Sequence, residues 1–236
     1  MTATPSSATP VLVATGLRKT YEEGRIRALD GVDLTLSRGE FVSIVGPSGS
    51  GKSTLLALLA GLDRPTEGQV LIDGTSLGGL SEDELALLRR RTIGFVFQSF
   101  HLLTNLTAHE NVMLPIELSG DSAARQKALD LLEQVGLKDR THHYPAQLSG
   151  GEQQRVAVAR AFAAEPAILL ADEPTGNLDG SNGDLVMNAM QSLQRERKTT
   201  LVIVTHDLTV TDQMDRVIHL RDGRVVQDEL VEARVS

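Results

Sequence analysis

The sequence predicts an α/β fold with an inserted helical segment, and three observations lead to this prediction. Short β-rich runs alternate with turns and helices from Val11 to about Phe97, and the same alternation returns from Ala167. Between about Asn105 and Ala164 the pattern is helical, with apolar residues three and four positions apart. A Gly-rich loop with the spacing of a phosphate-binding loop joins a strand to a helix. Strands on both sides of a helical stretch are typical of an α/β core with a helical lobe.

Each element of the first part is a short segment with its own hydrophobic pattern. The strands are runs rich in apolar and β-branched residues, bounded by turn-forming residues. Two further segments are predicted to be helical, and one of them directly follows the Gly-rich loop. The predicted strands are Val11–Leu17, Val32–Leu36, Phe41–Val45, Val70–Ile72 and Ile93–Phe97, and the predicted helices are Lys52–Ala60 and about Asp83–Arg91.

The middle part of the sequence is predicted to be helical, and the last part is predicted to alternate strands and helices again. Ala128, Leu129, Leu132 and Val135 have helical spacing, and Gly136 ends that helix as a C-terminal cap would. We expect a single domain over residues 11–230, with a core lobe of residues 11–98 and 165–230 and a helical lobe of about 99–164. In the last part strands and helices alternate again through Ile168–Ala171, Asp184–Leu193, Thr200–Thr205 and Val217–Leu220.

The composition limits the class of protein. A chain of 236 residues suits one domain or two closely joined lobes, and 41% apolar with 23% charged residues is typical of a globular protein. Lys and Arg number 23 and Asp and Glu 31, so the net charge of −8 argues against non-specific nucleic-acid binding. The chain has no Cys, which excludes disulfides and thiolate metal sites.

The N-terminus and the apolar runs argue against a segment that enters a membrane. Residues 1–10 are mostly Thr, Ser, Ala and Pro without a basic residue, so we expect a disordered lead-in and not a secretory signal. The longest apolar run, Leu55–Leu62, is far shorter than the roughly 18 residues that a membrane-spanning helix needs. We expect a cytoplasmic protein that meets a membrane only through a partner.

The loop after the third predicted strand has the spacing G-x-x-x-x-G-K-S. Its glycines let backbone N–H groups turn toward phosphate oxygens, and the helix N-terminus adds positive potential. Lys52 would bridge the β- and γ-phosphates, and the Ser53 hydroxyl would bind Mg²⁺. The plainer alternative is a Gly- and Ser-rich turn that happens to precede a helix. The predicted phosphate-binding residues are Gly46, Pro47, Ser48, Gly49, Ser50, Gly51, Lys52, Ser53 and Thr54.

Two adjacent carboxylates follow the apolar run Ile168–Ala171, and this run predicts a buried strand. Asp172 suits Mg²⁺, and Glu173 is placed to orient or deprotonate a water that attacks the γ-phosphate. Adjacent residues of a strand face opposite ways, so the two acids should have different roles. The alternative is an exposed acidic turn before Pro174.

A second Gly-rich segment opens the helix that runs through Phe162. Ser149 with two glycines at a helix N-terminus makes a second anion-binding site, and two phosphate sites on separate lobes suggest a nucleotide held between two chains. At this segment the sequence resembles the nucleotide-binding subunits of ABC transporters, and the resemblance extends from about Val11 to Val226. The segment that carries it is Leu148-Ser149-Gly150-Gly151-Glu152-Gln153-Gln154-Arg155.

The resemblance implies a fold, an activity and an assembly. The fold is a P-loop NTPase core, a mixed sheet with flanking helices, with an ABC-type antiparallel β subdomain and the inserted helical lobe. The activity is hydrolysis of ATP to ADP and phosphate, with ATP and Mg²⁺ as cofactors. The assembly is a homodimer in the ATP state, in which the signature segment of one subunit caps ATP on the P-loop of the other.

Further residues match the motifs of the family one by one. Tyr21 matches the aromatic residue that stacks on adenine, although a tyrosine on a surface strand is the plainer interpretation. Gln98 matches the glutamine that contacts Mg²⁺ and senses the membrane partner, and Asp179, in Asn177-Leu178-Asp179, matches the loop that crosses the dimer interface. His206, after a strand, matches the histidine that contacts the γ-phosphate. The resemblance thus implies Glu173, His206, Lys52 and Gln98 as catalytic residues, Ser53, Gln98 and Asp172 as metal ligands, and Tyr21, Ser149, Gly150, Gly151, Glu152 and Asp179 as nucleotide-binding residues beside the P-loop.

Within the family, four segments resemble the lipoprotein-release and macrolide-exporter branch, especially the stand-alone ATPases that partner an FtsX-like permease. This implies a membrane permease as partner and a place on the inner face of the cell membrane. Glu152 departs from the more common Gln and adds negative charge near the triphosphate. The segments are Gly61-Leu62-Asp63, Phe97-Gln98-Ser99-Phe100, Glu110-Asn111-Val112 and Ala171–Asp179.

Two other functions stay open at this point. One is a soluble ABC ATPase that acts on DNA or ribosomes, but the chain has one cassette and only 97 positions between Lys52 and Ser149, without heptads. The other is the ATPase of an FtsX-like complex that regulates cell-wall hydrolases and transports nothing. The permease is expected to dock among residues 98–118, where large apolar residues are frequent, although a locally folded core would explain them too. These residues are Phe100, Leu102, Leu103, Leu106 and Met113.

Overall fold

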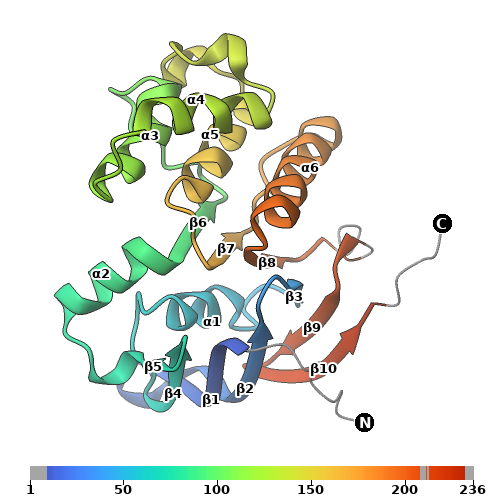
Figure 1. The fold of residues 1–236 in the computed structure, drawn as a ribbon. Coiled ribbons are helices and arrows are strands. Elements are labelled where there is room, and N and C mark those ends of the chain that lie inside the picture. Colours follow the sequence, from blue (N-terminus) through green and yellow to red (C-terminus); the bar gives the residue numbers. More distant parts are fainter. Residues whose placement is uncertain (1–9, 208–210, 212, 232–236) are drawn as a thin grey trace. The chain divides into compact units, whose positions relative to one another are not determined.

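The computed structural model describes residues 10–207, 211 and 213–231, and the chain divides into two units (Figure 1). The first unit takes the described residues up to Arg89 and those from Thr200 onward, and the second comprises Arg90–Thr199. Each unit has its own buried core. The predicted division into lobes at residues 98 and 165 stays a prediction.

In the first unit, long antiparallel strands form a four-stranded sheet in the order β2-β1-β4-β5. Leu12 of β1 pairs with Leu36 of β2 on one side and with Ile72 of β4 on the other, so three buried apolar residues lie in one row across the sheet. Such rows of cross-strand neighbours hold antiparallel strands together. The strands are β1 (Pro10–Tyr21), β2 (Ile26–Ser37), β4 (Glu67–Ile72) and β5 (Thr75–Ser76).

The remaining strands of the first unit are centred on β3 (Phe41–Val45), which lies between β8 and β9 and is parallel to both. Every residue of β3 and β8 is buried, as expected for parallel strands that are covered on both faces. The other elements of this unit are β8 (Thr200–Thr205), β9 (Arg216–Arg221), β10 (Arg224–Leu230), α1 (Lys52–Leu59) and α2 (Glu82–Thr92), whose last turn lies across the unit boundary.

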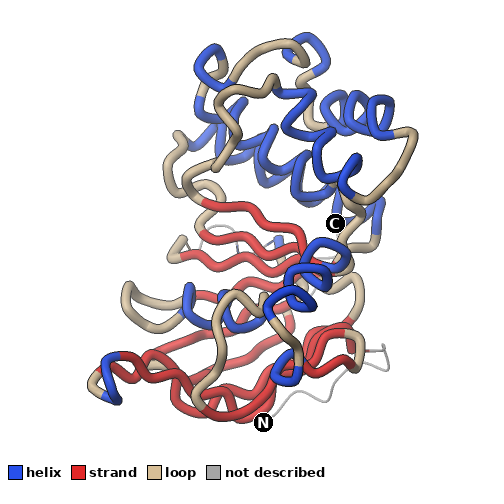
Figure 2. The backbone as a smooth tube through the Cα atoms, turned by 90° about the vertical axis from the view of Figure 1, so that its left-hand side faces the viewer, coloured by secondary structure: helices blue, strands red, loops and turns tan. Residues whose placement is uncertain are grey.

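The second unit combines helices with two strands that pair in parallel (Figure 2). Its core is built around α5, which buries eight of its residues. Gly94 of β6 lies so close to α5 that a Cβ atom there would come within 2.3 Å of the Ala161 carbonyl oxygen, so this position must be glycine. The elements are β6 (Ile93–Phe97), β7 (Ile168–Asp172), α3 (Ala108–Leu118), α4 (Ala124–Gln134), α5 (Gly150–Phe162) and α6 (Gly180–Arg197).

The α/β class and each predicted strand and helix are confirmed, although several elements are longer than predicted. Gly136 lies just after α4 with a φ of 73°, the left-handed conformation in which glycine ends helices. The predicted lead-in falls outside the described residues, except for Pro10, which begins β1. Among the described residues, no helix is both long enough and apolar enough to cross a membrane.

Candidate functional site

The P-loop lies in the first unit, between the end of β3 and the start of α1. Gly51 is the residue before α1 and has a φ of 100°, which side-chain-bearing residues rarely adopt. A Cβ atom at Gly46 would come within 2.1 Å of the Leu220 carbonyl oxygen, and one at Gly51 within 2.4 Å of the Ala28 carbonyl oxygen. The glycines are therefore required by the conformation of the loop and by its close contact with the surrounding backbone.

The Lys52 side chain folds back over this loop. Its Nζ donates hydrogen bonds to the carbonyl oxygens of Gly46, at 2.8 Å, and Pro47, at 3.0 Å, and the residue is only 9% exposed. Ser53, in the next position of the first helical turn, is exposed, while Ser50 is buried. An ammonium group is therefore held inside a loop at a helix N-terminus, where an anion is favoured.

Tyr21, at the end of β1, belongs to the same unit and is linked to the start of α1. Its hydroxyl donates to Asp63 Oδ2 at 2.9 Å and shares a hydrogen bond with the Thr54 side chain. Lys19 Nζ lies 2.6 Å from Asp63 Oδ1 and 4.8 Å from the centre of the Tyr21 ring. Burial first, and then the hydrogen bond with Asp63, raise the pKa of Tyr21, so the phenol stays protonated and keeps its donor role. The residue is 38% exposed.

His206 follows β8, and the register of the sheet relates it to the P-loop. Val45, the last residue of β3, pairs with Thr205, the last residue of β8. Gly46 and His206 therefore both follow the carboxyl ends of neighbouring parallel strands, the edge at which α/β proteins bind ligands. His206 is exposed there.

In the second unit, Gln98 and Glu173 likewise follow the carboxyl ends of two neighbouring parallel strands. Phe97 of β6 pairs with Asp172 of β7, so Gln98 and Glu173 both come directly after paired residues. Glu173 has a φ of 46°, a left-handed conformation that is unfavourable for a residue with a side chain and is found more often at functional sites. Gln154 of α5 is fully buried and its Nε2 donates to the carbonyl oxygens of Pro174 and Phe97, at 2.6 and 3.1 Å, so it links both strand ends to α5.

The signature segment forms the N-terminus of α5. Ser149 is the N-cap: its Oγ accepts from the Glu152 N–H, and Glu152 Oε2 accepts from the Ser149 N–H at 2.8 Å. Glu152 also forms an ion pair with Arg140 at 3.0 Å. The backbone N–H of Ser149, and then Arg140, lower the pKa of Glu152 against the opposing effect of burial. The negative charge of Glu152 is therefore bound by the Ser149 N–H and by Arg140, both of which belong to the second unit.

Gly151 and Asp179 bring α5 and α6 together. A Cβ atom at Gly151 would lie 2.4 Å from Asn182 Oδ1, so this helix contact requires glycine. Asp179 is the N-cap of α6 and accepts from the Asn182 N–H at 2.9 Å, from the Asn182 side chain and from Ser181 Oγ at 2.8 Å. The backbone bond from Asn182 is the main cause that lowers the pKa of Asp179. Asp179 thus has a capping role that the sequence analysis did not predict.

The segment after Gln98, predicted to meet the permease, is ordered by two polar side chains. Buried Asn111 donates to three carbonyl oxygens of this segment, including that of Leu103, and accepts from the Leu103 N–H. Arg160 donates to the carbonyl oxygens of Phe100 and His101, and burial lowers its pKa. Leu103 is 44% exposed, whereas Phe100, Leu102, Leu106 and Met113 are half-buried.

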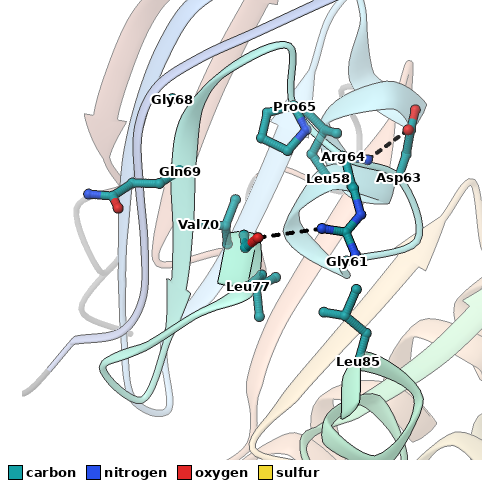
Figure 3. A pocket seen from close by; sticks show the side chains of 11 residues that line it. Leu58, Gly61, Asp63, Arg64, Pro65, Gly68, Gln69, Val70, Leu77 and Leu85 are labelled. Atoms are coloured by element: carbon teal, nitrogen blue, oxygen red, sulfur yellow. Dashed lines mark hydrogen bonds between the residues drawn. The ribbon is translucent and has the colours of Figure 1, made fainter. Parts of the chain in front are cut away.

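A separate hollow of about 170 Å³ lies in the first unit, between α1, β4 and α2 (Figure 3). Its wall is mostly apolar, and Arg64 lies along it with Nη1 directed at the Gly78 carbonyl oxygen, 3.4 Å away. None of the predicted site residues lines it, so it is distinct from the P-loop. The lining residues are Leu58, Gly61, Asp63, Arg64, Pro65, Gly68, Gln69, Val70, Leu77, Gly78 and Leu85.

Sequence reasoning did not predict a role for Asp63, Gln154 or Asn177. Asp63 and Asn177 each contact a predicted site residue, and Gln154 contacts Phe97 and Pro174, the neighbours of Gln98 and Glu173. Asp63 binds Tyr21, and Asn177 binds Gln98, across 42 and 79 positions of sequence. No local spacing signals such pairs, since they depend on which distant segments the fold brings together. Asp63 lies within a segment that resembles the branch, and Asn177 lies within the segment that matches the loop across the dimer interface, but neither residue was assigned a role of its own.

Comparisons with known proteins agree with this geometry. Residues 29–176 match the family model described as ABC transporter. The chain is 50% identical over 226 residues to the lipoprotein-releasing system ATP-binding protein LolD of Xanthomonas axonopodis pv. citri, covering 94% of this chain and 93% of the relative. It is 48% identical over 223 residues to LolD of Legionella pneumophila, covering 93% and 98%.

Two solved structures are similar over almost the whole chain. A dimeric structure of a bacterial ABC transporter cassette has a TM-score of 0.86 at 46% identity and covers 94% of this chain and 99% of its own. A dimeric post-hydrolysis state of an ATP-binding cassette bound to ADP and Pi has a TM-score of 0.85 at 45% identity, with the same coverage. The chain belongs to the ABC transporter family and is one of its ATP-binding, ATP-hydrolysing cassettes.

Proposed function

We propose that this chain is the motor subunit of a lipoprotein-releasing transporter. As a homodimer it would hold two Mg-ATP and drive a conformational change in a partner permease. The observation that carries the proposal is the presence of two anion-binding helix N-termini, the P-loop in one unit and the capped signature segment in the other. Their chemistry supports nucleotide binding, and the lipoprotein-releasing relatives support the cargo and the permease partner.

ATP binding would depend first on the P-loop unit. The carbonyl oxygens that now accept from Lys52 are neutral, so the charged oxygens of a triphosphate can replace them with stronger hydrogen bonds. Exposed Ser53 and the N–H groups of the first turn of α1 add further donors. Adenine would stack on the exposed Tyr21, whose hydroxyl is fixed by Asp63 and Thr54.

The predicted metal ligands fit Mg²⁺ by their donor chemistry. Ser53, Gln98 and Asp172 offer a hydroxyl, an amide and a carboxylate oxygen, and Mg²⁺ prefers such hard oxygen ligands. In the described part of the chain, no three His, Cys, Asp or Glu residues cluster closely enough to hold a metal ion by themselves. This agrees with a cation held by one carboxylate together with substrate phosphates. When bound, Mg²⁺ would neutralise the charge that develops on the phosphates.

Hydrolysis would then depend on Glu173 and His206. Glu173, beyond the end of β7, would orient the attacking water and accept its proton. His206, beyond the end of β8, would contact the γ-phosphate. In the dimer, the signature of the opposite subunit would complete the site. Ser149 Oγ accepts from the Glu152 N–H, so its own O–H remains a donor for a phosphate oxygen.

The partner would be a permease, of the lipoprotein-releasing or FtsX-like type, which keeps this chain on the inner face of the cell membrane. It would dock on the segment of residues 98–118, where Leu103 is exposed and Asn111 holds the backbone in one conformation. Gln98 begins this segment, so a change in its contacts with nucleotide can reach the permease.

The proposal is tested by reconstitution of the chain with the membrane protein that co-purifies with it. Proteoliposomes that carry a fluorescent lipoprotein would be given ATP and a soluble lipoprotein acceptor, and release would be measured. We expect ATP-dependent release that is absent with Lys52→Ala. ATP hydrolysis that the permease stimulates, without any release, would contradict the lipoprotein cargo and favour the regulation of cell-envelope enzymes.

A further inference from the structure

The side chain of Gln98 is paired with that of Asn177 in the second unit. Gln98 Nε2 donates to Asn177 Oδ1 at 3.1 Å, and Asn177 Nδ2 donates to the backbone carbonyl oxygen of Gln98 at 3.1 Å. Asn177 therefore binds both the side chain and the backbone of the same glutamine. Both residues are exposed, so the pair lies at the surface of the unit and not in its core.

The backbone contact determines the orientation of both carboxamides. A carbonyl oxygen only accepts hydrogen bonds, so the end of Asn177 that faces the Gln98 carbonyl must be its NH₂ group. The other end of Asn177 is then an acceptor, and Gln98 must present its own NH₂ group to it. Gln98 Oε1 is thereby left as the end that is not used in the pair. For a glutamine that is to bind a cation, this is the correct end, because only the oxygen can be a ligand.

The backbone around the pair is anchored on both sides. Gln154 donates to the carbonyl oxygens of Phe97 and Pro174, which precede Gln98 and follow Glu173. The Gly176 N–H donates to the Glu173 carbonyl oxygen at 3.1 Å and closes a turn directly before Asn177. A Cβ atom at Gly176 would lie 3.0 Å from Gln98 Nε2, so the glycine leaves room for the paired carboxamide.

We propose that Asn177 is a positioning residue that holds Gln98 with Oε1 available to Mg²⁺. The inference rests on the proposed function, in which Gln98 is a metal ligand. Partners behind a metal ligand commonly fix its orientation and strengthen metal binding. Asn177 also belongs to the segment that leads into α6, so the orientation of Gln98 depends on the conformation of this segment.

The test measures Mn²⁺, as a substitute for Mg²⁺, in protein that does not turn over. ATP would be bound in substoichiometric amount to Glu173→Gln protein, and the loss of the free Mn²⁺ signal would be followed by electron paramagnetic resonance. Asn177→Ala should weaken Mn²⁺ binding about tenfold, while ATP affinity in EDTA stays unchanged. Gln134→Ala is the matched control, because it removes another exposed amide hydrogen bond of this unit, to Glu196.

Two further variants separate positioning from a merely structural role. In Gly176→Ala the new Cβ would push against Gln98 Nε2, so this variant should also weaken Mn²⁺ binding. It replaces Asn177→Ala in the test if Asn177→Ala fails to fold. Adding Asn177→Ala to Gln98→Ala should weaken Mn²⁺ binding no further than Gln98→Ala alone.

The outcomes are distinguishable. Unchanged Mn²⁺ affinity in both Asn177→Ala and Gly176→Ala, with Gln98→Ala weakened, overturns the positioning role alone. An additive loss in the double variant overturns it as well, because Asn177 then acts without Gln98. Unchanged affinity in Gln98→Ala overturns both this inference and the metal-binding role of Gln98 in the proposed function.

Discussion

The Lys52 side chain is hydrogen-bonded to its own loop, and these contacts indicate how its charge is used. A buried ammonium needs hydrogen-bond acceptors, and the carbonyl oxygens of Gly46 and Pro47 supply them. Phosphate oxygens are stronger acceptors because they carry charge. Lys52 should therefore change partners when nucleotide binds, and its removal should affect binding more than the folding of the loop.

Lys52→Ala should lower ATP affinity by about tenfold to a hundredfold, since hydrogen bonds to charged groups are worth roughly 1.5–3 kcal/mol. Isothermal titration with ATP measures the loss. Lys138→Ala, at an exposed lysine of the second unit that pairs with Glu133, is the control and should bind ATP normally. Equal affinity of Lys52→Ala and the parent would show that the loop is only a turn.

At the scale of single residues, the sequence predicts Tyr21 and Gln98 as site residues but does not predict which side chains bind them. A match to a family motif predicts both residues, but not Asp63 or Asn177, which hold their polar groups. These partners lie 42 and 79 positions away, so their contacts follow from the tertiary fold and not from local spacing. The left-handed backbone conformation of Glu173 was not predictable either, because a glutamate gives no signal for it.

At the scale of elements, α5 begins with a capping box whose glutamate is also ion-paired. Glu152 accepts from the Ser149 N–H and pairs with Arg140. Gln at this position could keep the first contact but would lose the second. The structure thus gives Glu152 a role in stabilising the start of the signature helix.

Glu152→Gln should lower the stability at pH 7 by at most about 1 kcal/mol, because Arg140 is well exposed and screened by solvent. The folded-state pKa of Glu152 is lowered, so its contribution is complete above its unfolded pKa, about 4.3, and disappears as pH falls through the folded-state pKa. The difference in Tm between parent and variant, measured by circular dichroism, should therefore be constant above about pH 5 and shrink at lower pH. A difference that grows with acid would contradict the assigned pairing.

The contact between β6 and α5 makes a second prediction for this unit. Gly94→Ala places a Cβ atom 2.3 Å from the Ala161 carbonyl oxygen, and backbone must move to admit it. We expect a loss of about 1–3 kcal/mol in the free energy of unfolding, measured in urea. Gly180→Ala, at the first position of α6 with open space around it, should be neutral or slightly stabilising. Equal stability of the two variants would mean that β6 does not lie this close to α5.

Elements were predictable where burial alone determines the residue pattern. The parallel strands β3, β7 and β8 are continuous apolar runs, and each was predicted within a residue or so. β10 was missed because it is an edge strand with mostly polar, exposed residues. Arg216 of β9 binds Asp228 of β10 at 2.6 Å and helps to hold this strand in place, and such a pair leaves no periodic signal in the sequence.

At the scale of the whole molecule, the motifs are shared between the two units. The first unit carries Tyr21, the P-loop and His206, and the second carries Gln98, Asp172 and Glu173 together with the signature and Asp179. ATP binding should therefore tolerate a change at Glu173 that abolishes hydrolysis, so that binding and chemistry are separable at this residue.

The most direct test is Glu173→Gln, measured for ATP binding, turnover and dimerisation. An amide neither accepts the proton of the attacking water nor holds the water as a carboxylate does. We expect ATP affinity equal to the parent, turnover reduced to background, and an ATP-dependent dimer that is stable in gel filtration. Turnover within about threefold of the parent would contradict the role of Glu173 and with it the account of hydrolysis.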